Sequence, residues 1–298
     1  MKLGAVYPQI ELGGDPEAVR RIGDALGGLG YDHLLAYDHV LGAVHADRDP
    51  TLLGPYTERD PFHDPFVLFA YLAGRCPGLE FVTGILILPQ RQTALVARQA
   101  ADLSLLSGGR FRLGVGIGWN HVEYTALGQD FSTRGAREEE QIEVLRALWS
   151  GTVVDFEGRF DRIERATTLP APVEPVPVWL GGFSEPAVER AARVGDGFIF
   201  AGSEAHVLEQ WQRLRELLGE HDREVDGFGA QYNVLSKDGP NGAAAKIERW
   251  ADNGGTHAAV VTMGLGLDSV DAHLDYVGEV AAALGRGSTG AGPPTISL

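Results

Sequence analysis

Residues 176–200, VPVWLGGFSEPAVERAARVGDGFIF, contain the pattern that decides the fold. A short apolar run ends in two glycines, a stretch of helical periodicity follows, and a second apolar run ends the segment. Ser184 and Pro186 are residue types that begin helices, so we expect the helix to start near Glu185. A strand, a helix and a second strand in this order are typical of one unit of a parallel α/β sheet.

The same alternation runs along the whole chain and predicts its architecture. Strands are expected in apolar runs bounded by glycine, proline or polar residues, at 2–8, 31–39, 79–89, 110–118, 176–182, 196–202, 228–236 and 256–264. Such a set of eight strands with helices between them predicts a (β/α)8 TIM barrel of the α/β class. We expect a long polar loop after the second strand and a β-hairpin excursion at 152–170, before the fifth strand, with Gly158 at its turn.

The chain length fits one such barrel, so we predict a single domain over residues 1–285. Residues 286–298 lack periodicity and are expected to form a flexible C-terminal tail. Helix N-caps are expected at Asp15 and Asp64, each followed by proline at the first helical position.

Composition and charge exclude several function classes. The 298 residues are 44% hydrophobic and 22% charged, as in ordinary globular chains, and the net charge of −16 argues against nucleic acid or an anionic membrane surface as a partner. The single cysteine, Cys76, excludes an intramolecular disulfide and any multi-cysteine metal site. The N-terminal apolar run is too short for a signal peptide or a membrane span, so a cytoplasmic protein is expected.

Polar residues directly after strands are the candidates for chemistry, because barrel enzymes place their sites at the carboxyl ends of the strands. Asp38 and His39 end the second strand, where an imidazole can transfer a proton near neutral pH and a carboxylate can orient a ligand or the backbone. We expect both to leave the apolar interior at the mouth, where neither is buried without a partner. An isolated Asp-His pair is more often the start of a loop than a catalytic site.

Two glycine-rich stretches follow later strands. The glycines at 114, 116 and 118 lack the G-x-G-x-x-G spacing, so this stretch alone indicates only a tight backbone path. Residues 181–184 precede a helix whose free amides would suit a phosphate, although an ordinary capped helix has the same pattern. Histidines and aspartates in the long loop show no metal-binding spacing, and no metal site is predicted.

Several segments together resemble the bacterial luciferase-like family of flavin and deazaflavin oxidoreductases. They are YDHV (37–40), HDPFVLFAYLAG (63–74), VTGILILPQR (82–91), RFRLGVGIGWNHVEYTALG (110–128) and the run from Glu157 to Phe200. The similarity covers about residues 1–285 and is greatest to the branch that uses the deazaflavin coenzyme F420. It implies a luciferase-like barrel, a small-molecule substrate and a possible homodimer.

The resemblance also implies roles for individual residues. His39 would be catalytic, as the group that moves the proton accompanying hydride transfer, and Asp38 would fix the local backbone and contact the ring edge of the cofactor. A cis peptide bond is expected between Gly84 and Ile85, behind the ring. The cofactor-binding residues implied by the family are Asp38, Gly84, Ile85, Gly116, Ile117, Gly118, Trp119, Gly181, Gly182, Phe183 and Ser184, the last four at the phosphate.

The substrate is expected to be apolar or aromatic. Sugar-phosphate dehydrogenases of this family have an acidic residue where Trp119 stands, and an indole cannot serve as a proton partner. The loop from Gly42 to His63 is long enough to shape a substrate pocket, for which we predict His45, Tyr56, Arg59 and Phe62.

Together with the predicted barrel, the resemblance implies an F420-dependent oxidoreductase that transfers a hydride between the deazaflavin and a small organic substrate. An FMN-dependent luciferase-like monooxygenase is the alternative within enzymes. A catalytically silent flavin-binding protein and a metal-dependent barrel hydrolase are alternatives of other classes.

Overall fold

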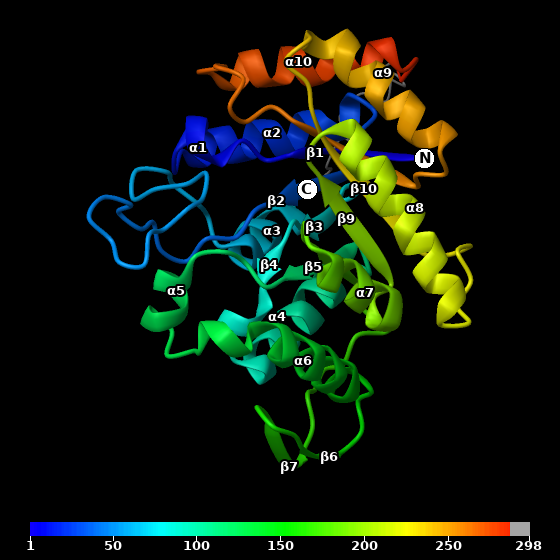
Figure 1. Ribbon diagram of the computed structural model, residues 1–298. Helices are drawn as coiled ribbons and strands as arrows, with labels where there is room; N and C mark the ends of the chain where they lie inside the picture. The colour runs from blue at the N-terminus through cyan, green and yellow to red at the C-terminus, as the bar shows by residue number, and fades with distance from the viewer. Residues whose placement is uncertain (287–298) are drawn as a thin grey trace, which may run out of the picture.

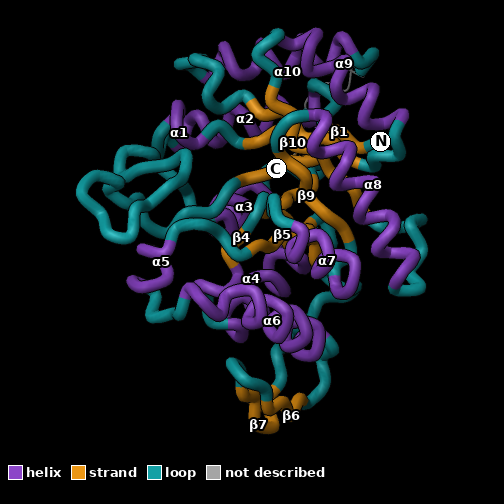
Figure 2. Tube along the Cα trace, in the orientation of Figure 1, coloured by secondary structure: helices purple, strands orange, loops and turns teal. Residues whose placement is uncertain are grey.

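The computed structural model describes residues 1–286, and its strands close into a parallel barrel (Figures 1 and 2). The strands follow one another around the ring in the order β3-β2-β1-β11-β10-β9-β8-β5, and β5 pairs with β3 to close it. The strands of the barrel are β1 (Lys2–Val6), β2 (His33–Ala36), β3 (Glu80–Thr83), β5 (Phe111–Gly116), β8 (Val178–Gly181), β9 (Gly197–Ala201), β10 (Gly229–Leu235) and β11 (His257–Val261). The short strand β4 (Leu86–Ile87) continues the path of β3 and also pairs with β5. All eight predicted strands are therefore present, and the predicted (β/α)8 barrel is confirmed.

Helices alternate with the strands and surround the barrel (Figure 1). They are α1 (Gln9–Leu12), α2 (Pro16–Gly28), α3 (Pro65–Ala73), α4 (Thr93–Leu106), α5 (His121–Ala126), α6 (Arg134–Trp149), α7 (Glu185–Val194), α8 (Glu204–Glu220), α9 (Gly239–Asp252) and α10 (Val270–Ala283). Two 3-10 turns, η1 (Leu88–Gln90) and η2 (Phe131–Thr133), precede α4 and α6. The Asp15 carboxylate accepts the N–H of Glu17 and that of Asp64 accepts the N–H of Val67, which confirms both predicted N-caps.

Apolar side chains fill two layers. The larger layer lies between the barrel and its helices, and a smaller cluster fills the inside of the barrel, with Leu35, Val82 and Trp179 among its members. The strands are buried on both faces, which explains why they appear in the sequence as continuous apolar runs rather than alternating ones.

Two excursions leave this regular pattern, as predicted. The chain between β2 and α3 forms a long loop, and β6 (Val154–Glu157) pairs with β7 (Arg162–Ala166) in a hairpin that projects beyond α6 (Figure 1). The carboxylate of Glu140 on α6 accepts the backbone N–H groups of Arg159, Phe160 and Asp161, each at 2.7 Å, and so holds the hairpin turn.

Within residues 1–286, no helix is long and apolar enough to cross a membrane. The predicted tail, 286–298, lies outside the described residues except for Arg286.

Candidate functional site

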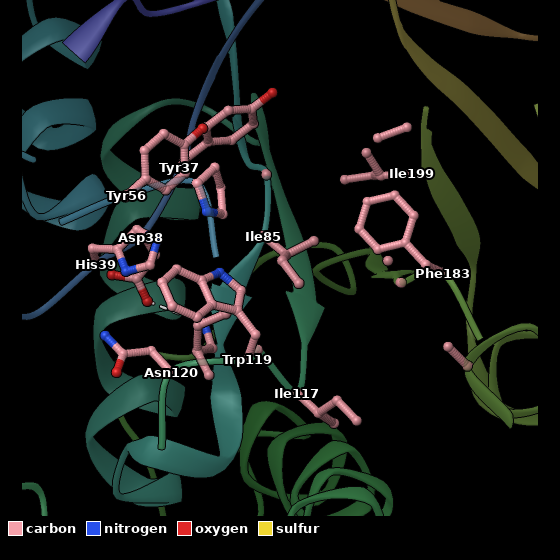
Figure 3. Close-up of a pocket in the computed structure, with 18 of the residues that line it drawn as sticks. Tyr37, Asp38, His39, Tyr56, Ile85, Ile117, Trp119, Asn120, Phe183 and Ile199 are labelled. Carbon is pink, nitrogen blue, oxygen red and sulfur yellow. Dashed lines mark hydrogen bonds between the residues drawn. The ribbon is translucent and has the colours of Figure 1, made fainter. Parts of the chain in front are cut away.

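A cavity of about 450 Å³ opens at the carboxyl ends of the strands (Figure 3). Asp38 after β2, Gly84 after β3, Trp119 after β5 and Ser184 after β8 all line it, so four strand ends meet at one mouth as the barrel prediction required. The predicted site residues in its wall are Asp38, His39, Tyr56, Gly84, Ile85, Ile117, Gly118, Trp119, Gly181, Gly182, Phe183 and Ser184.

The other predicted residues lie outside the wall, at different distances from it. Phe62 is behind it, with its ring centroid 4.8 Å from that of His39, and His45 is 6.0 Å from the Trp119 ring. Gly116 lies under the side chain of Ile85. Arg59 points to solvent with 84% of its side chain exposed and lies beside Glu58, so the structure does not bring it to the cavity.

Asp38 is buried, contrary to the expectation that it leaves the interior at the mouth. The residue is 3% exposed, and its carboxylate accepts hydrogen bonds from Arg91 Nη2 at 2.7 Å and from the N–H of Ile87 at 3.0 Å. Burial raises the pKa of the Asp38 carboxyl, and the Arg91 guanidinium opposes that rise. Arg91 also lies 3.5 Å from Asp64, the cap of α3. Asp38 therefore joins β2 to the segment after β4 through an ion pair.

His39 lies at one wall of the cavity within a group of aromatic rings (Figure 3). The centroid of its imidazole is 5.2 Å from that of Tyr56, 4.8 Å from Phe62 and 5.6 Å from Trp119. These neighbours limit the rotation of the imidazole. Nδ1 of His39 is 3.4 Å from Oε1 of Glu123, so the imidazole has a carboxylate on one side.

Glu123 on α5 is a fully buried acid that the sequence did not indicate. Its Oε1 accepts the N–H groups of Val40 at 2.7 Å and Leu41 at 3.0 Å, and its Oε2 accepts Gln90 Nε2 at 3.2 Å. Burial alone would raise the pKa of this carboxyl, but the facing imidazole of His39 and the hydrogen bonds from Leu41 and Gln90 lower it below its ordinary value. Glu123 thus holds the chain directly after His39.

Further wall residues were also missed, and they are Tyr37, Pro55, Ile87, Ala187, Ile199, Ala201 and Asn233. Most are apolar or neutral residues on or next to strands, where strand periodicity predicts burial but not which cavity a side chain faces. The position of Glu123 three residues after Asn120, the N-cap of α5, was the only available signal for a buried acid, and a six-residue helix is too short to show an apolar face.

Two glycines allow the backbone to approach Ile85 closely. A Cβ on Gly116 would lie 1.9 Å from Cδ1 of Ile85, and a Cβ on Gly181 would lie 2.8 Å from its Cγ2. The peptide bond between Gly84 and Ile85 is cis, as predicted. Ile85 therefore lies over β5 and β8 in the floor of the cavity, and neither glycine position has room for a side chain.

The opposite side of the cavity is formed by the start of α7. Ser184 is the N-cap residue, but its hydroxyl makes no capping hydrogen bond, and Phe183 is 69% exposed at the mouth (Figure 3). Glu185, the first helical residue, pairs with Arg213 of α8 at 2.9 Å, which directs its charge toward that helix. The hydroxyl of Ser184 is thus free for a ligand, whereas Pro186 removes one amide from the first turn.

Charge is scarce in the cavity. Among its described wall residues there is no lysine or arginine, and the two acids, Asp38 and Glu123, are both engaged with partners. Across residues 1–286, no three His, Cys, Asp or Glu side chains are grouped so as to hold a metal ion. The wall suits a flat, largely apolar ligand, with backbone and hydroxyl groups at the α7 end for an anionic extension.

A comparison of the sequence with protein-family models identifies the family of the chain. The model of the luciferase-like monooxygenases matches residues 3–287. The chain belongs to this family. Members of this family are F420- or FMN-dependent oxidoreductases and monooxygenases.

Two curated relatives share part of the luciferase-like sequence. Rv0940c, an uncharacterized protein of Mycobacterium tuberculosis (strain ATCC 25618 / H37Rv), is 37% identical over 183 residues, which are 58% of this chain and 63% of the relative. The F420-dependent glucose-6-phosphate dehydrogenase of the same organism is 34% identical over 148 residues, 47% of this chain and 44% of that enzyme. The alignments thus cover less than two thirds of the length of either relative.

Solved structures share the luciferase-like fold over nearly the whole chain. An F420-dependent secondary alcohol dehydrogenase in complex with an F420-acetone adduct has a TM-score of 0.77 at 16% identity, covering 95% of this chain and 98% of that one. Similar structures include F420-dependent enzymes and a monooxygenase in complex with FMN. At this level of identity the similarity shows the fold alone.

Proposed function

We propose that the protein is an F420-dependent oxidoreductase that transfers a hydride between the deazaflavin and a neutral, apolar or aromatic substrate. The observation that carries this proposal is the His39–Glu123 pair at the wall of an otherwise apolar cavity. Hydride transfer to or from an organic molecule is accompanied by transfer of a proton, and a positioned imidazole is the side chain best suited to move it near neutral pH. The partial identity with an F420-dependent dehydrogenase supports the same cofactor.

The residues of the cavity fit a deazaflavin. The apolar wall between Ile85 and Trp119 suits a flat ring system, and the glycines at 116 and 181 keep side chains off the surface behind it. Gly182 and Ser184 would hold the phosphate with backbone N–H groups and the free hydroxyl. When bound, the cofactor supplies the hydride-accepting or hydride-donating carbon.

Side chains of the protein would exclude water from the reacting atoms and transfer the proton. Tyr56 and Trp119 would cover the reacting atoms and exclude water, and His39 would take up or return the proton at its imidazole. Asp38 would act at a distance by holding the backbone of Ile87 rather than by touching the cofactor ring.

The substrate class follows from charge. The amides and hydroxyl at the start of α7 are assigned to the cofactor phosphate, and no lysine or arginine among the described wall residues is left to bind a phosphate or carboxylate of the substrate. Tyr56, Trp119 and Phe183 would instead contact apolar or aromatic groups. We expect no turnover of a sugar phosphate. Small-molecule partners are thus proposed, and the homodimer implied by the family stays a prediction.

A turnover screen with F420 tests the proposal. Neutral apolar and aromatic alcohols, ketones and enones, with glucose 6-phosphate as a contrast, are mixed with protein and oxidised or reduced F420, and the cofactor absorbance is followed. With an active substrate, His39→Ala should lower kcat by roughly 10²- to 10⁴-fold, because a general acid or base contributes about that factor. The exposed His221→Ala should have no effect. Wild-type turnover by His39→Ala would contradict the assigned role.

An FMN-dependent monooxygenase is the second candidate. The aromatic group around His39 would shield a reduced flavin from water, and FMN is bound by a structural neighbour of the same fold. Substrate-dependent oxygen uptake with reduced FMN, without F420 turnover, would favour this candidate.

A further inference from the structure

The contacts of Glu123 determine how the imidazole of His39 can be protonated. Oε1 of Glu123 faces Nδ1 of His39 at 3.4 Å and also accepts the backbone N–H groups of Val40 and Leu41. Its second oxygen is engaged by Gln90. Because Glu123 is 0% exposed, solvent does not compete for these oxygens. The carboxylate is therefore a fixed acceptor behind one edge of the imidazole.

An ionised carboxylate accepts hydrogen bonds and cannot donate them. The hydrogen bonds that Glu123 receives keep its pKa below the ordinary value despite the opposing effect of burial, so the group is ionised at neutral pH. A neutral imidazole facing it is favoured with its hydrogen on Nδ1, and the lone pair then lies on Nε2. The rings of Tyr56, Phe62 and Trp119 limit rotation of the imidazole away from this arrangement.

We propose that Glu123 is a positioning residue that fixes neutral His39 in the tautomer with hydrogen on Nδ1, leaving Nε2 as the proton acceptor of the site. The catalytic role of this tautomer rests on the proposed function. A hydroxyl group of the substrate would lose its proton to Nε2 of His39 while the carbon bearing that hydroxyl loses a hydride to the cofactor. Glu123 would then stabilise the imidazolium. The tautomer itself requires neither cofactor nor substrate.

His45 provides an internal reference with the opposite tautomer. Its Nε2 is 2.9 Å from the carbonyl oxygen of Tyr56, which can only accept, so neutral His45 must have its hydrogen on Nε2. His39 and His45 both lie beside the Trp119 ring but should differ in tautomer. A change at Glu123 should alter the imidazole of His39 and leave His45 as it was.

The test is ¹⁵N NMR of the imidazole groups in cofactor-free protein, recorded over a pH series and read at the pH where both imidazoles are neutral. The signals of His39 and His45 are assigned from His39→Gln and His45→Gln among nine histidines. We expect the Nδ1–H form for His39 and the Nε2–H form for His45. In Glu123→Gln the amide oxygen can still accept from Val40 and Leu41, so the fold is kept. The neutral acceptor is weaker, and the His39 tautomer ratio should shift about tenfold toward Nε2–H.

Two further variants make the outcome decisive. Glu123→Leu removes every acceptor and should convert His39 to the Nε2–H form, and Glu143→Gln, at an exposed position of α6, should change neither histidine. An Nε2–H form of His39 in the unaltered protein, or an unchanged ratio in Glu123→Gln, would overturn the proposal. If Glu123→Leu does not fold, the Glu123→Gln result decides.

The same variants separate this inference from the proposed function. With a substrate found for F420, Glu123→Gln should lower kcat at least tenfold with less than a threefold change in KM. No turnover with F420 would overturn the proposed function while the tautomer result still stands. Wild-type kcat in Glu123→Gln would overturn the positioning role, even if F420 turnover is confirmed.

Discussion

Replacing Arg91 by methionine should destabilise the protein strongly, because it leaves Asp38 as a buried carboxylate without a cation. The Asp38 side chain is 1% exposed and the Arg91 side chain is 15% exposed, so water cannot take the place of the guanidinium. After the substitution, the N–H of Ile87 is the only hydrogen-bond donor left to Asp38 among the described residues. Methionine replaces the aliphatic part of the arginine side chain, so the loss of apolar packing is small.

The size of the effect follows from the burial of the pair. Breaking a buried ion pair by removing one partner costs about 3 to 5 kcal/mol. The unfolding entropy of about 2.1 cal/mol/K per residue gives about 0.6 kcal/mol/K for a chain of 298 residues. The melting temperature should therefore fall by about 5 to 8 °C.

Calorimetry on three variants tests this reasoning. Asp38→Asn combined with Arg91→Met removes both charges and should recover at least about 2 kcal/mol of the loss in the single variant. Arg98→Met removes the partner of Asp102 from an exposed pair 3.6 Å apart and should cost less than about 1 kcal/mol. The loss in Arg91→Met should shrink at acidic pH, where Asp38 is protonated. A fall below about 2 °C, or no recovery in the double variant, would refute the buried ion pair.

Three other predictions concern the cofactor and the pH dependence of stability. Ser184→Ala should raise the cofactor dissociation constant by about 5- to 30-fold in a fluorescence titration, because a hydrogen bond to a charged group contributes about 1 to 2 kcal/mol. An unchanged dissociation constant would mean that Ser184 serves only as the N-cap residue of α7. Gly116→Ala should weaken cofactor binding and cost about 1 to 3 kcal/mol of stability, because its Cβ would lie 1.9 Å from Cδ1 of Ile85; wild-type binding and stability would contradict this. Burial raises the pKa of Glu138 from 4.5 to about 7, although Arg190 faces it. As the pH rises, this carboxyl therefore ionises in the unfolded chain before it ionises in the folded one. The free energy of unfolding should consequently fall as the pH rises from 4.5 to 7. Relative to Glu138→Gln, the parent protein should lose about 2 to 3 kcal/mol between pH 4.5 and 8 in denaturant titrations, and parallel curves would contradict the shift.

The barrel could be predicted because its signals are local. Each strand is a short apolar run with turn residues at its ends, and caps such as Asp15 and Asp64 mark where helices begin. The closed ring then places strand ends that are distant in sequence around one mouth. This is why Asp38, Trp119 and Ser184 could be expected to meet there from the sequence alone.

The contacts behind the cavity wall could not be predicted in the same way. Asp38 is buried because Arg91, 53 positions later, is its partner, and Glu123 reaches His39 from a six-residue helix. Such pairings depend on side-chain directions in the folded chain and leave no periodic pattern. The sequence likewise does not determine the direction of Arg59 in the long loop, and its side chain is directed to solvent rather than to the cavity.

The most direct test of the central claim is a side-by-side titration of the protein with F420 and with FMN, each oxidised and reduced. Fluorescence and absorbance report binding, and Gly116→Ala shows whether the ligand occupies the cavity over Ile85. We expect F420 to bind at least tenfold more tightly than FMN and Gly116→Ala to weaken this binding. Tight binding of FMN with no measurable binding of F420 would contradict it.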